Sequence, residues 1–183
     1  MNFREYLSYF DEILNNPNPP APYNDKDYWE YTKLNRARLN RWLKQGAIDE
    51  SFKIKIKAID KPQSWIIITE PWCGDAAHIV PFIEMVSQIN PLITTKYELR
   101  DAPPFRIEQY LSNGSKSIPI LIVFDEEGNE KFHWGPRPEK AQELYLDLKK
   151  QNTNPEDTRI ALQNWYNSNK GEELQKELQA LLI

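Results

Sequence analysis

Residues 66–81 read IIITEPWCGDAAHIVP and contain the only cysteine of the chain, Cys73. The apolar, mostly β-branched run at 65–69 is typical of a strand that is buried on both faces. A Thr-Glu-Pro turn follows it, and apolar residues at helical spacing over 75–89 then predict a helix. The stretch therefore predicts a strand, a loop and a helix, with Cys73 at the helix N-terminus. Cysteines in that position are often reactive, which makes Cys73 the candidate functional residue.

The composition of the 183 residues is typical of a soluble globular protein. Apolar residues make up 40%, charged residues 27%, and the net charge is −4. No basic block suggests nucleic acid as a partner, and no apolar run is long enough to span a membrane. The first residues lack the apolar segment of a signal peptide, and one cysteine cannot form an internal disulfide. We therefore expect a cytoplasmic protein.

The first sixty residues predict a helical extension. Apolar residues at helical spacing over 2–14 indicate a first helix, which the prolines of 15–24 must end. Asp25 is a good N-terminal cap for a second helix that stops at Gly46. Residues 50–60 fit either an edge strand or a helix, and the fold favours the helix. The residues predicted on the buried side of the second helix are Trp29, Leu34, Leu39, Trp42 and Leu43, and those on its solvated side are Arg36, Arg38 and Arg41.

The remaining residues predict alternating strands and helices. A strand, a helix and a second strand imply a parallel pair joined by a right-handed crossover. A hairpin then adds antiparallel strands, so we expect an α/β fold with a mixed central sheet and helices on both faces. We divide the chain into an extension, 1–60, packed on a domain, 61–183, that ends in C-terminal helices. The later strands are expected at 93–99, 118–125 and 130–134, and the later helices at 103–111, starting with Pro103 and Pro104, at 138–150, and beyond Asn154 with a break at Gly171.

Four features together carry a resemblance to the thioredoxin family. They are Trp72-Cys73-Gly74 between strand and helix, Pro81 within the helix, Ile118-Pro119 entering a strand, and Gly135 after the hairpin. The segments WCGD, NGSKSIP at 113–119 and WGPRP at 134–138 are similar to a bacterial subgroup of thioredoxin-like proteins. The resemblance implies a thioredoxin-like fold and a cis peptide bond before Pro119. It also implies a site around Cys73 that is lined by Trp72, Gly74, Asp75, Ala76, Ile118, Pro119, Trp134 and Gly135.

Two departures from the family pattern bear on activity. Ala76 occupies the position of the second, resolving cysteine, and Ile67 occupies that of the buried aspartate that assists proton transfer in thioredoxins. If the protein is an enzyme, it is a thiol–disulfide oxidoreductase without a resolving cysteine. The mixed disulfide on Cys73 would then need an external thiol, such as glutathione or a protein thiol. The alternative is a redox-inactive module that binds a peptide or protein in the groove beside Pro119.

The charges around Cys73 do not favour its thiolate. The helix N-terminus stabilises a thiolate by about 0.3–1 kcal/mol at an exposed site. Asp75, at about 6 Å, opposes it by about 3 kcal/mol at an effective dielectric of about 20. We therefore expect a thiol that is activated weakly or not at all, or one that is simply packed as a small apolar group. Cys73, Asp75 and His78 lack the spacing of zinc sites, so we expect no metal and no cofactor.

Overall fold

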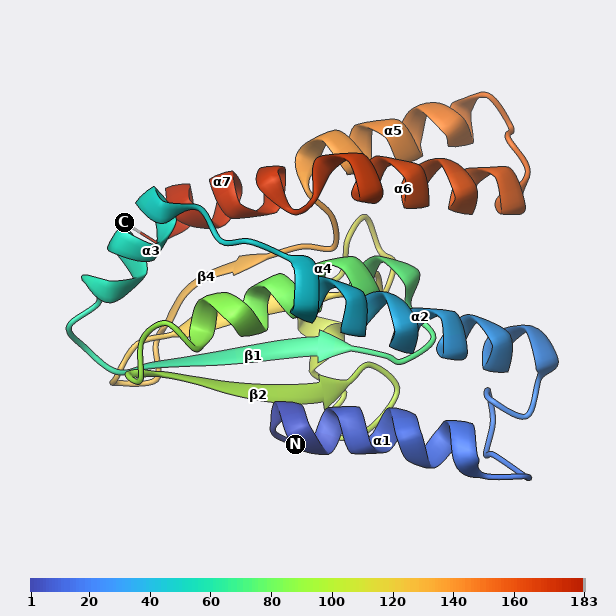
Figure 1. Cartoon of the computed structure of the whole chain (residues 1–183), viewed down its shortest axis with the longest axis horizontal. Coiled ribbons are helices and arrows are strands. Elements are labelled where there is room, and N and C mark those ends of the chain that lie inside the picture. The colour runs from blue at the N-terminus through green and yellow to red at the C-terminus, as the bar shows by residue number, and fades with distance from the viewer. Residues whose placement is uncertain (183) are drawn as a thin grey trace.

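A four-stranded mixed sheet forms the centre of the computed structural model, which describes residues 1–182 (Figure 1). The strands are β1 (Gln63–Thr69), β2 (Ile93–Leu99), β3 (Ile120–Phe124) and β4 (Glu130–Trp134), in the order β2-β1-β3-β4. β1 pairs in parallel with β2 and antiparallel with β3, and β3 pairs antiparallel with β4. The predicted α/β fold class with a mixed sheet is confirmed. Ile183, the last residue of the predicted domain, lies outside the described residues.

Helices pack around this sheet (Figure 1). The crossover from β1 to β2 is α4 (Gly74–Ser87), which packs against α2 (Lys26–Gln45). The first helix, α1 (Phe3–Asn15), lies along β2. In the upper part of Figure 1, α5 (Glu139–Lys150) and α6 (Pro155–Asn169) lie side by side. The remaining described α-helices are α3 (Glu50–Lys57) and α7 (Glu172–Leu181). No described helix is both long and apolar enough to cross a membrane.

Local signals place the helix ends where the sequence predicts them. The Asp25 side chain accepts hydrogen bonds from the backbone N–H groups of Asp27 and Tyr28, so it caps α2. Asn154 caps α6 through the N–H of Asp157. Gly171, at φ 82°, separates α6 from α7. The ambiguous segment 50–60 is helical over most of its length, because Phe52 and Ile56 both point into the core.

The core lies between the sheet and α4, and it includes residues from both ends of the chain. β1 is buried almost throughout, as its continuous apolar run predicts. Pro81 lies inside α4, which continues through it. Tyr6 and Phe10 from α1, and Leu174 and Leu178 from α7, belong to the same apolar cluster. The N-terminal and C-terminal helices are therefore part of one core with the sheet.

Two predictions about single segments are wrong. Leu34 is 47% exposed, because Thr32 and Asn35 occupy the buried side of α2 instead. The predicted helix at 103–111 shrinks to the short 3-10 turn η1 (Arg106–Gln109). Phe105 precedes this turn at φ 55°, a left-handed conformation that a right-handed helix cannot contain, so the turn begins only after it.

Candidate functional site

Cys73 lies at the junction of β1 and α4, where it is the N-cap residue of the helix. Its Sγ accepts a hydrogen bond from the Ala76 backbone N–H at 3.5 Å. The thiol S–H donates to the carbonyl oxygen of Ile118 at 3.4 Å. The peptide bond between Ile118 and Pro119 is cis. Residues that are 45 positions apart in sequence thus meet at the carboxyl end of β1.

Burial determines the chemistry of this thiol. Only 6% of Cys73 is exposed, and burial raises the pKa of its thiol to about 12, with the charge of Asp75 as the second cause. The Ala76 N–H and the Arg137 guanidinium act in the opposite direction but are weaker. The sequence predicts a poorly activated thiol from the charge of Asp75 or a thiol packed as a small apolar group, and the structure makes desolvation the larger cause. Cys73 is therefore a neutral thiol whose proton is held by the Ile118 carbonyl.

Asp75 is fully paired, which sequence reasoning did not foresee. Its carboxylate forms an ion pair with Arg137 at 2.7 Å and accepts a hydrogen bond from the Tyr166 hydroxyl at 2.8 Å. Arg137 also lies over the ring of Tyr145, 4.4 Å from its centroid. The pair joins α4 to the loop after β4 and to α6. Nothing in the local pattern around Tyr166 distinguishes it from an ordinary core residue of an amphipathic helix.

The other predicted site residues have separate partners. Trp72 is half-buried and packs against the ring of Tyr28 and under the guanidinium of Arg100, 4.6 Å from the ring centroid. Gly74 is exposed, and Ala76 is buried. Trp134 is buried, and its Nε1–H donates to Glu177 on α7 at 2.7 Å. The structure therefore brings Ala76 and Ile118 directly to Cys73 and ties Trp134 to α7.

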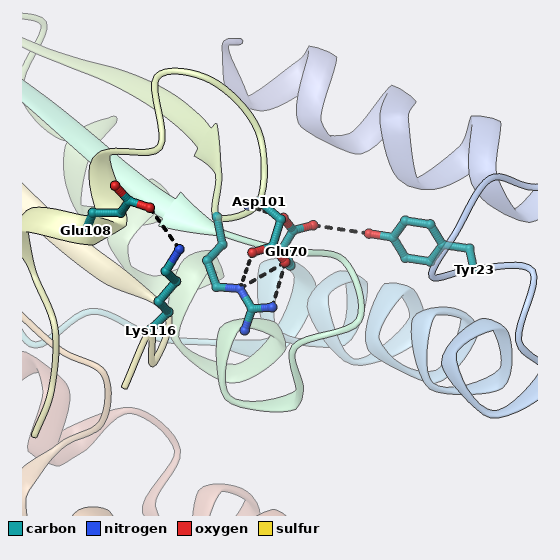
Figure 2. A network of polar contacts seen from close by, with 6 residues as sticks. Tyr23, Glu70, Asp101, Glu108 and Lys116 are labelled. Carbon is teal, nitrogen blue, oxygen red and sulfur yellow. Dashed lines mark hydrogen bonds and ion pairs between the residues drawn. The ribbon is translucent and has the colours of Figure 1, made fainter. Parts of the chain in front are cut away.

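Glu70, a buried carboxylate directly after β1, begins the loop that leads to Cys73 (Figure 2). Glu70 is 5% exposed and accepts hydrogen bonds from the Tyr23 hydroxyl at 3.2 Å and the Asp101 backbone N–H at 3.1 Å. Burial raises the pKa of this carboxyl group. Figure 2 also shows the ion pair between Glu108 and Lys116, which lies in the segment that leads to Pro119. The distance from Lys116 Nζ to Glu108 Oε1 is 3.0 Å. Glu70 thus connects the end of β1 to the segment before α2 and to the segment after β2.

His78 occupies the other side of α4 and is built into the core. Its Nδ1 accepts from Trp42 Nε1–H at 2.8 Å, and its ring stacks on Tyr166 at 4.7 Å. The neutral ring then carries its proton on Nε2, which contacts the side-chain amide of Gln163 and is satisfied when that amide presents its oxygen. Both nitrogens are engaged, so His78 is not available as a metal ligand in this arrangement. In residues 1–182, no three His, Cys, Asp or Glu side chains are grouped to hold a metal ion.

His78 makes stability depend on pH. Burial lowers the pKa of its ring to about 3, below its ordinary value of 6.5. As the pH falls, the unfolded chain binds the proton before the folded protein does. The contribution of neutral His78 to the free energy of unfolding is therefore fully present above about pH 6.5 and is lost as the pH falls toward about 3. Urea unfolding should show about 2 kcal/mol lost to His78 between pH 7 and pH 5. His78→Gln, which keeps an acceptor for Trp42, should flatten this dependence. An unchanged slope in His78→Gln would contradict the assignment.

Comparison with known proteins agrees with this fold. The family model of thioredoxin matches residues 22–176. A protein of unknown function from Pseudomonas aeruginosa has a similar structure, with a TM-score of 0.59 and 16% identity over 100% of this chain and 97% of that one. An HIV epitope scaffold gives a TM-score of 0.57 and 16% identity, over 100% and 98% of the two chains. No curated protein matches the sequence. Because the family model covers most of the chain, the chain belongs to the thioredoxin family.

Proposed function

We propose that this protein is a redox-inactive binding module, a cytoplasmic member of the single-cysteine group that carries Trp72-Cys73-Gly74-Asp75. One observation carries the proposal, namely that the Cys73 thiol is 6% exposed, with a pKa of about 12. Thiol–disulfide exchange begins with attack by an accessible thiolate. A thiol with that pKa is almost entirely protonated at neutral pH, and its S–H is already bound to Ile118.

The connection from β2 to Pro119 supports a binding role, because it carries exposed apolar side chains. Phe105 is 45% exposed and Leu111 is 47% exposed, and both lie in the connection from β2 to Pro119. Arg100 begins the same connection and packs on Trp72, and this contact links the connection to the Cys73 loop. Exposed apolar side chains at the carboxyl ends of the parallel strands are suited to contact a protein or an extended peptide. The partner in this proposal is therefore a polypeptide.

Monothiol exchange is the second candidate, and the position of Cys73 favours it. The sulfur lies against the Ile118 carbonyl, directly before the cis bond to Pro119. In this reaction the Cys73 thiolate attacks a disulfide, a mixed disulfide forms, and the other sulfur leaves as a thiolate. The thiolate of glutathione would then attack the substrate sulfur of the mixed disulfide, form a new disulfide with it and release Cys73 as a thiolate. Both steps require Cys73 to become exposed and to lose its proton.

The rate of iodoacetamide labelling as a function of pH separates the two candidates. For the native protein we expect the rate to rise through pH 10 without reaching a plateau, because the pKa of the thiol is about 12. The urea-unfolded protein, which serves as the control, should show an apparent pKa of about 8.5. A native plateau at or below that value would favour monothiol exchange. A binding module should also retain its captured partners in Cys73→Ser and lose them in Phe105→Asp.

A further inference from the structure

Most arginines of this protein have a carboxylate partner. Arg4 is exposed at the N-terminus and needs none. Two arginines on α2, Arg38 and Arg41, are half-buried and form no ion pair within residues 1–182. The five pairs are Arg36 with Asp11, Arg100 with Asp101, Arg106 with Glu98, Arg137 with Asp75 and Arg159 with Glu156.

Neutral amides take the place of carboxylates around these two arginines. Arg38 Nη1 donates to Asn35 Oδ1 at 3.0 Å, and Arg41 Nη2 donates to Asn167 Oδ1, on α6, at 2.6 Å. The Arg41 Nε–H is buried and has no hydrogen-bond partner. The Arg41 guanidinium lies 4.6 Å from the centroid of the Trp42 ring. The contacts present therefore leave donors of both guanidinium groups unused.

The electrostatics of Arg38 and Arg41 indicate that these two cations lack a counter-charge. Residues three apart lie on the same side of a helix, so Arg38 and Arg41 repel each other. Burial, and then the charge of Arg41, lower the pKa of Arg38. By contrast, the pKa of Arg106, beside Glu98, is raised. Half-buried cations without a counter-charge are unfavourable, and an anion between them would relieve both the repulsion and the desolvation.

We propose that Arg38 and Arg41 form an oxyanion-binding site where α2 meets α6, and that it takes a phosphate or carboxylate group. Guanidinium groups bind both anions through paired N–H donors. Asn167 orients Arg41 from the α6 side. On the α2 side, Asn35 accepts from Arg38 and donates from Nδ2 to the Pro71 carbonyl at 3.0 Å, which connects the site to the Cys73 loop. The inference is independent of the proposed binding role of that loop.

Inorganic phosphate is the first probe. Thermal unfolding of the full chain is followed in phosphate and in chloride at equal ionic strength. We expect the melting temperature to rise with phosphate along a saturating curve, as for a ligand that binds only the folded state. Arg38→Gln and Arg41→Gln should each weaken the apparent affinity by about tenfold or more, because each removes a charged donor. Arg36→Gln is the matched control, since Arg36 already pairs with Asp11, and should leave the affinity unchanged.

The variants separate specific binding from a general salt effect. Phosphate stabilises many proteins by exclusion from their surface, and that effect would persist unchanged in Arg38→Gln and Arg41→Gln. An equal rise in all four proteins, or no rise in the wild type, would overturn the proposal for phosphate. Acetate in the same series tests a carboxylate. Saturable, arginine-dependent stabilisation by either anion supports the site and identifies its group, and the absence of both excludes it.

Discussion

An Arg137→Gln variant is expected to melt about 4–12 °C below the wild type. Arg137 and Asp75 are 2.7 Å apart, and their side chains are only 14% and 12% exposed. Removing one member of a buried pair leaves an uncompensated charge, which costs about 3–5 kcal/mol, and the remaining solvent contact reduces this to about 2–3 kcal/mol. For a chain of this size, each kcal/mol corresponds to about 2–4 °C. Differential scanning calorimetry at pH 7 measures the shift.

Asp75→Asn supplies the control for this prediction. If Arg137→Gln is destabilising because it leaves the Asp75 carboxylate without its partner, the double variant, Asp75→Asn with Arg137→Gln, should be more stable than the sum of the two single losses predicts. Strictly additive losses would show that Arg137 acts through its packing on Tyr145 instead. Asp75→Asn should also speed the alkylation of Cys73, because the Asp75 charge raises the pKa of the thiol.

The central elements of the fold can be predicted from the sequence because their signals are local. The apolar run of β1, the capping residue Asp25 and the break at Gly171 each act within a few residues. The segment 50–60 shows the limit of prediction from local signals, since its apolar residues fit the spacing of a strand as well as that of a helix. The choice of helix there depends on where Phe52 and Ile56 find the core.

The environment of Cys73 could not be predicted in the same way. The contact between Asp75 and Tyr166 joins residues 91 positions apart, and no spacing rule connects them. Neighbouring residues reveal that Cys73 begins a helix, but they do not reveal how completely the fold covers it. The same limit applies to Arg38 and Arg41, which the helical pattern places on a solvated face. In the structure both are half-buried, and Arg41 is bonded to Asn167 on α6.

Gly135→Ala should destabilise the protein by at least about 3 kcal/mol, with a fall in melting temperature of about 6–12 °C. Gly135 has φ +131°, a conformation that side chains with a Cβ rarely adopt. An added Cβ would also lie 2.3 Å from the Pro119 carbonyl oxygen and 3.3 Å from the Ile120 Cα. Because the closest of these atoms is the backbone carbonyl oxygen of Pro119, β3 or the loop after β4 must move to accommodate the methyl group. Urea unfolding and thermal melts provide the measurement.

Gly128→Ala separates the two causes of this loss. Gly128 also has a positive φ, +85°, but an added Cβ would meet nothing within 4 Å. It should therefore cost only the conformational penalty of about 1–2 kcal/mol. The difference between the variants measures the close approach of Gly135 to Pro119, which holds the end of β4 against the segment that contacts Cys73. If this approach keeps the thiol covered, Gly135→Ala should also label faster with iodoacetamide, whereas Gly128→Ala should label at the wild-type rate. Equal losses of stability in the two variants would mean that the segment around Pro119 moves at little cost in free energy and does not constrain the site.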